Sequence, residues 1–111
     1  MKTIKIPELK IEVETKLRQP VTGKDIQIPR GWRLMTFEEA CWIYDNLNKE
    51  LEIGKKTEWI EYYSSRMKER GYFAALYSNG DFDYRLYVDG YYRSGDRYGC
   101  AFGVRFVRDL K

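Results

Sequence analysis

Few residues in this chain could carry catalysis or hold a metal. Histidine is absent, which removes Ser-His-Asp and Cys-His pairs, His-ligated zinc and the usual general base near neutral pH. The two cysteines, Cys41 and Cys100, are too few for a disulfide framework, and two thiolates fall short of the four ligands of a structural zinc site. We therefore interpret both cysteines as core residues rather than a disulfide or redox pair, and we expect no enzyme activity, metal or cofactor.

The composition of a segment near the C-terminus points instead to binding. Of the 22 residues from 77 to 98, 16 are Tyr, Ser, Asn, Gly or Asp. Tyrosine supplies a large amphipathic contact surface with only two χ angles, and the small polar residues add adaptable hydrogen bonds, as in antibody paratopes. The segment predicts recognition of a protein or another macromolecule. The expected ligand-binding residues are Asp83, Tyr84, Tyr87, Asp89, Tyr91, Tyr92, Arg93, Ser94, Asp96 and Tyr98.

Strand alternation indicates which of these side chains face solvent. Leu86 and Val88 alternate as buried strand residues, so Tyr87 and Asp89 are expected to point outward. The competing interpretation is an ordinary β-rich core, because tyrosine also favours strands. The adjacent pair at 91 and 92 argues against it, since consecutive strand residues face opposite sides and at least one tyrosine must be exposed.

The rest of the chain must supply the scaffold. A length of 111 residues predicts a single domain, residues 1–111, with the binding segment at 77–98. Apolar and polar residues alternate over 4–6, in part over 11–17, and over 26–28, which indicates strands.

A helix is expected to begin at Thr36, because its hydroxyl can cap the first turn while Glu39 reaches back in a capping box. Its apolar stripe would comprise Phe37, Cys41, Tyr44, Leu47 and Leu51. Gly54 breaks this helix, and a second is expected from Thr57. The shared face of the second helix would comprise Ile60, Tyr63 and Met67.

The C-terminal third is expected to form a small antiparallel sheet. Residues 72–77 read as a buried strand, and residues 78–80 are a turn signal that leads into the alternating stretch 82–88, so a hairpin is predicted. Residues 100–108 supply one last strand. The predicted fold class is therefore α+β, with two helices and a small antiparallel sheet.

Two of these segments resemble a known family when they are taken together. They are Gly-Trp-Arg-Leu-Met-Thr-Phe-Glu-Glu-Ala at 31–40 and Gly-Val-Arg-Phe-Val-Arg at 103–108. The first resembles the entry to the first helix, and the second the closing strand, of C-type-lectin-like domains of the formylglycine-generating-enzyme type. Met35 stands where that family usually has proline. The resemblance implies a C-type-lectin-like fold.

Within that group, the segment 77–98 looks like the variable region of proteins from diversity-generating retroelements, especially archaeal or viral ones. Codons there are randomised at adenines, and changing the first two bases of an Asn codon gives Tyr, Asp, Ser and Gly among others. The Gly-Gly-Ser-Trp motif of many such proteins is missing. The resemblance implies a display protein with a changeable Tyr/Asp/Ser/Arg-rich face. The alternative is a small structural or carbohydrate-binding lectin-like domain without a variable region.

Three rival chemistries are disfavoured. The formylglycine-generating enzymes hold copper with a cysteine pair, but Cys41 lies in a core stripe. The acidic run 79–83 imitates a calcium loop, yet Tyr84 and Gly90 stand where such a loop needs glycine and glutamate. Four aspartates outnumber three arginines between 77 and 98, so that segment would repel a phosphate backbone and no nucleic acid is expected.

The chain lacks the features of a membrane or secreted protein. No run approaches the ~18 apolar residues of a membrane span, and residues 1–10 lack the apolar region of a signal peptide. We therefore expect no membrane partner, and a protein that is cytoplasmic or incorporated in a virus particle. The sequence specifies no oligomeric state.

Overall fold

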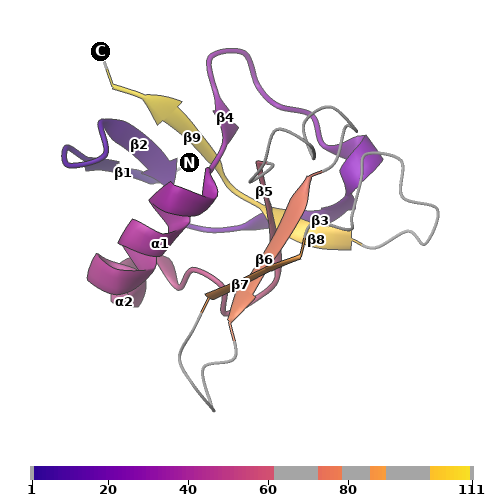
Figure 1. Cartoon of the computed structure of the whole chain (residues 1–111). Coiled ribbons are helices and arrows are strands. Elements are labelled where there is room, and N and C mark those ends of the chain that lie inside the picture. Colours follow the sequence, from indigo (N-terminus) through magenta and orange to yellow (C-terminus); the bar gives the residue numbers. More distant parts are fainter. Residues whose placement is uncertain (1, 62–72, 79–85, 90–100, 111) are drawn as a thin grey trace.

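The computed structural model describes residues 2–61, 73–78, 86–89 and 101–110. Within these residues, strands and two α-helices form an α+β architecture (Figure 1). The strands are β1 (Thr3–Ile6), β2 (Ile11–Glu14), β3 (Arg18–Thr22), β4 (Arg33–Leu34), β5 (Glu58–Ile60), β6 (Ala74–Ser78), β7 (Leu86–Asp89), β8 (Ala101–Val104) and β9 (Phe106–Asp109). The helices are α1 (Phe37–Asn46) and α2 (Asn48–Leu51), with a 3-10 turn, η1, at Gly23–Asp25.

The first sheet joins both ends of the described chain in the order β1-β2-β9-β4, with every pairing antiparallel. Side chains of β2 alternate between its faces, so Ile11 and Val13 enter the core while Glu12 lies on the other face. The Glu12 carboxylate accepts a hydrogen bond at 2.7 Å from Arg108, its cross-strand neighbour on β9. This ion pair gives the largely buried Glu12 carboxylate a partner of opposite charge.

The second sheet has the order β3-β8-β5-β6-β7, and its β5–β8 pair is parallel while the others are antiparallel. Trp59 lies near the middle of this sheet and is fully buried. Its indole N–H donates to the Val21 carbonyl at 2.8 Å, and its ring packs against Phe102 with centroids 4.9 Å apart. This aromatic therefore ties the central strand to the edge strand β3.

The chain passes from one sheet to the other at Arg105. β8 belongs to the second sheet and β9 to the first, and only this residue separates them. The single strand expected over 100–108 is therefore wrong in its middle, although most of its residues are in strands. Since the backbone leaves one ladder and enters another here, the residues on both sides of Arg105 remain paired.

The capping box at the start of α1 is confirmed. The Thr36 hydroxyl accepts the Glu39 N–H at 3.1 Å, and the Glu39 carboxylate accepts the Thr36 N–H at 3.0 Å. These two bonds satisfy amides that have no partner within the helix. The expected continuous helix is interrupted at Leu47, whose φ of −134° is not helical, and α2 follows as a separate short turn.

The buried stripe of α1 is rotated from the expected one. Ala40 and Ile43 are the fully buried residues of α1, whereas Cys41 is half-buried. The prediction that Cys41 is a core residue is therefore wrong, and Cys100 lies outside the described residues. The physical reason is that the small Ala40 and the branched Ile43 turn toward the sheets. Phe37, Tyr44 and Leu47 flank them as partly buried contacts, and Leu51 is buried.

Two hydrophobic clusters hold these layers together. The larger includes Ala40 and Ile43 of α1 together with residues of β1 and β2. The smaller lies around Trp59 on the other face of β5. The larger includes Ile6, Ile11, Val13, Met35, Ala40, Ile43, Leu51, Ile53, Ile60, Ala74, Leu76 and Val107. The smaller includes Leu34, Trp59, Val104 and Phe106.

In the N-terminal half, one predicted strand is absent and one strand was not predicted. Residues 26–28 are in no strand, while β3 forms instead over a stretch that contains Pro20. Proline cannot donate to a ladder and is therefore confined to edge strands or bulges. β3 satisfies both conditions, since it is the first strand in its sheet's order and its register shifts between Arg18 and Val21.

The helix expected from Thr57 is wrong over its first turn. Residues 58–60 form β5, which is buried on both faces, and an apolar run of this kind cannot be told from a helix by periodicity alone. Tyr63 and Met67, on which that helix prediction depended, lie outside the described residues. The predicted hairpin is confirmed in its described part, because β6 and β7 pair antiparallel.

Candidate binding face

In the β6–β7 hairpin, the register places residue 88 opposite Leu76 and residue 87 opposite Tyr77. Leu76 is fully buried and pairs with Val88, whereas Tyr77 is 40% exposed and pairs with Tyr87. Directly opposed residues of an antiparallel pair lie on the same face of the sheet. The sequence predicts that residue 87 points outward, and the residue opposite it on the neighbouring strand is an exposed tyrosine.

Two of the ten expected ligand-binding residues have a described backbone. Tyr87 and Asp89 are in β7, and Asp89 pairs with Ala75 of β6. β7 is the last strand in the order of the second sheet. The expected site residues that lie outside the described part of the chain are Asp83, Tyr84, Tyr91, Tyr92, Arg93, Ser94, Asp96 and Tyr98.

A buried aromatic layer borders β6 on the face that carries Ala75 and Tyr77. Ala75 is covered and pairs with Trp59 of β5. The Trp59 ring meets Phe73 edge-on, with centroids 6.4 Å apart, in addition to its contact with Phe102. Interiors packed in this way hold their backbone in one arrangement. β6 is therefore held on this face by the aromatic layer and on the opposite face by Ala74 and Leu76, which belong to the larger cluster.

A buried ion pair lies in the same sheet. Glu58 and Arg105 are 0% and 2% exposed, and their side chains meet at 3.0 Å and 3.3 Å through Nε and Nη2. The Gly54 N–H also donates to the Glu58 carboxylate. Burial raises the pKa of Glu58 to about 6, against the opposing effect of the Arg105 charge and these hydrogen bonds. This pair anchors the point where the chain changes sheets.

Sequence reasoning missed this ion pair. It expected Arg105 within one last strand over 100–108 and assigned it no partner. The available signal was an arginine inside an otherwise apolar run and a glutamate directly before Trp59. A buried charge requires a partner of opposite sign, but the partner is 47 positions away in the sequence.

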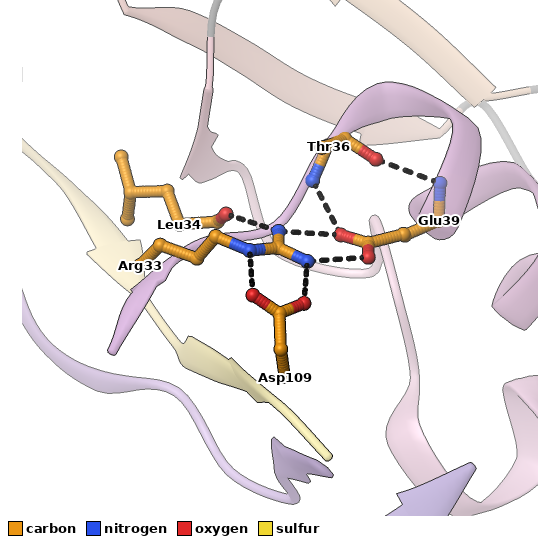
Figure 2. Close-up of polar contacts among 5 residues, drawn as sticks. All are labelled: Arg33, Leu34, Thr36, Glu39 and Asp109. Atoms are coloured by element: carbon orange, nitrogen blue, oxygen red, sulfur yellow. Dashed lines mark hydrogen bonds and ion pairs between the residues drawn. The ribbon is translucent and has the colours of Figure 1, made fainter. Parts of the chain in front are cut away.

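A second charged cluster joins β4, α1 and β9, and Figure 2 shows it in close-up. The Arg33 guanidinium lies between two carboxylates, with both nitrogen-to-oxygen distances to Glu39 at 2.8 Å and the shorter distance to Asp109 at 2.9 Å. Burial raises the pKa of Glu39, but the Arg33 and Thr36 hydrogen bonds outweigh it and hold that pKa below its ordinary value. The hydrogen bond from Arg33 lowers the pKa of Asp109.

This second cluster is suited to structure rather than to chemistry. Both Glu39 oxygens are occupied by Arg33 or by the cap of α1, so neither is free to take a proton from a substrate. The thiol of Cys41 is also a poor nucleophile, because burial and the nearby charges of Asp45 and Glu38 raise its pKa. Among the described residues no group of three or more His, Cys, Asp or Glu side chains could hold a metal ion.

In the portions of the chain that the structure describes, no helix is long and apolar enough to cross a membrane. Comparison with known proteins finds no matching family model, no matching curated protein and no matching solved structure.

Proposed function

We propose that the chain is a ligand-binding display protein whose Tyr/Asp/Ser/Arg-rich surface, within residues 77–98, recognises a macromolecular target. The observation that carries the proposal is the register of β6 and β7. It aligns Tyr87 with the exposed Tyr77 and Val88 with the buried Leu76. Tyrosine supplies a large amphipathic contact surface with only two χ angles, and antibody paratopes use it for this reason.

The scaffold of this proposal is a C-type-lectin-like domain. The two segments that carry the resemblance support it, because they lie side by side: Arg33 pairs with Val107 and Leu34 with Phe106. The Arg33 cluster adds Glu39 and Asp109 to the same junction. A closing strand locked to the entry of the first helix would give the proposed variable segment, 77–98, a fixed scaffold.

The proposed activity is binding and needs no catalytic group. The target is a protein or another macromolecule, and the surface would vary among copies of the gene. If codons 77–98 are diversified, a near-copy of them that differs only at adenines is expected beside a reverse-transcriptase gene. Sequencing the flanking DNA tests this part, and a locus with neither element contradicts it.

Binding itself is tested with a display library. Residues 87, 89, 91 and 92 are varied among Tyr, Ser, Asn, Asp and Gly, and the library is selected against an immobilised protein such as lysozyme. Most members are expected to fold with a Tm near that of the parent, and selected members to bind lysozyme. A matched library that varies the buried Leu34 and Phe106 should fail to fold. Equal failure of both libraries would contradict the proposal.

A further inference from the structure

A charged groove lies where the turn after β2 meets the end of α2. Its volume is about 460 Å³, a size typical of small-molecule sites. The residues that line it include Lys16, Leu17, Glu50, Lys55, Lys56 and Arg105.

One lining residue, Arg105, has a guanidinium nitrogen with weak partners. Arg105 uses Nε and Nη2 for Glu58, at 3.0 Å and 3.3 Å. Its Nη1 reaches only the carbonyl oxygens of Glu14 and Thr15, both at 3.5 Å. These distances are at the outer limit of a hydrogen bond. A stronger acceptor in the groove could therefore engage Nη1 without displacing Glu58.

The rim of the groove carries more positive than negative charge. Lys55 is paired with Glu52 at 3.2 Å. Lys16 and Lys56, both exposed, have no ion-pair partner among the residues that the structure describes, and Glu50 is the one other acidic residue of the lining. Two free ammonium groups and one carboxylate leave this rim attractive to anions.

A second groove adjoins the first and combines apolar with polar surface, the latter from Arg18, Gln19 and Thr57. Its volume is about 370 Å³, and it shares Leu17 and Lys56 with the first. Its other walls include Pro20 and Phe102. A ligand that crosses Leu17 would therefore have its anionic group in the first groove and an uncharged part in the second.

We propose that these grooves bind a small phosphorylated ligand, whose phosphate group lies between Lys16, Lys56 and the Arg105 guanidinium. A phosphate monoester carries a charge of about −1.5 to −2 at pH 7 and three strong acceptor oxygens. It can therefore satisfy two ammonium groups and the Nη1 donor together, whereas one carboxylate has one charge and two oxygens. The site shares no residue with the proposed binding face, so either proposal can fail alone.

The test is a titration of the ¹⁵N-labelled full chain, followed by NMR, with inorganic phosphate, with glucose 6-phosphate and with glucose. Sodium chloride at matched ionic strength is the control for screening. Saturable shifts are expected at the amides of Lys16, Leu17 and Lys56 with both phosphates and not with chloride or glucose. Lys16→Ala and Lys56→Ala are each expected to weaken binding about tenfold, the loss typical of a charged hydrogen bond. Lys5→Ala, an exposed change on β1, should leave it unchanged.

The two phosphates identify the source of the anion. Tighter binding of glucose 6-phosphate indicates that the second groove holds the organic part, whereas equal affinity indicates that free phosphate is the ligand. Shifts that follow ionic strength alone would overturn the proposal. So would saturable binding that neither lysine substitution weakens.

Discussion

Glu39 and Asp109 hold the same arginine, yet their removal should have very different effects on stability. Glu39 accepts two hydrogen bonds at 2.8 Å from Arg33, and its side chain is only 12% exposed. The side chain of Asp109 is 71% exposed. A hydrogen bond to a charged group contributes about 1.5–3 kcal/mol when it is shielded, and an exposed ion pair about 0–1 kcal/mol. Glu39→Gln should therefore cost about 2–3 kcal/mol, and Asp109→Asn less than about 1 kcal/mol.

Glu39→Gln removes the charge of this side chain but keeps an acceptor for the helix cap. A glutamine keeps a carbonyl oxygen for the Thr36 N–H, so the capping box can persist. Urea unfolding at pH 7, followed by circular dichroism, measures both losses. Because the folded pKa of Glu39 lies below its ordinary value of 4.5, its contribution is present above pH 4.5 and disappears as the pH falls through the folded pKa. Equal losses for both variants, or a Glu39→Gln loss that persists in strong acid, would refute this reasoning.

Three further outcomes are expected in the scaffold. The pKa of Glu58 is raised from 4.5 to about 6, so the folded chain keeps a proton that the unfolded chain loses. As the pH rises from 4.5 to 7, the free energy of unfolding of the wild type should therefore fall by about 2 kcal/mol relative to that of Glu58→Gln, as measured by parallel urea titrations. Trp59→Phe leaves the Val21 carbonyl without its donor and should cost about 2 kcal/mol by urea unfolding, with unchanged stability arguing against that bond. Gly103→Ala would place a methyl group 3.0 Å from Leu17 Cδ1 and should lower stability by about 1–2 kcal/mol. This loss should be smaller in a Leu17→Ala background, and additive losses in the double variant would contradict the contact.

Local signals in the sequence predicted the elements that local contacts build. The capping box needs only Thr36 and Glu39, three positions apart, and it is present. The turn signal between a buried apolar run and an alternating stretch predicted the β6–β7 pairing in the same way. These features are set by neighbours in the chain, so one sequence is sufficient to find them.

The errors occurred where distant contacts decide the structure. Residues 58–60 were expected in a helix, but their backbone pairs with Ala74–Leu76 on one side and with Gly103 on the other. Arg105 was expected on a strand face, but its partner is 47 positions away. Tertiary pairing of this kind overrides local preference. For the proposed binding face, the sequence gives the residue types and the alternation of buried and exposed positions. The structure adds the register that aligns Tyr87 with Tyr77.

The binding face is tested most directly by the free energy of unfolding of four variants of the full chain. Leu34 and Phe106 are 1% and 2% exposed, so Leu34→Ala and Phe106→Ala should each cost about 2–5 kcal/mol. Tyr87→Ala and Tyr92→Ala should each cost less than about 1 kcal/mol if these rings face solvent. Losses as large at the two tyrosines as at the two core residues would show that the tyrosines fill the interior, and would contradict the account.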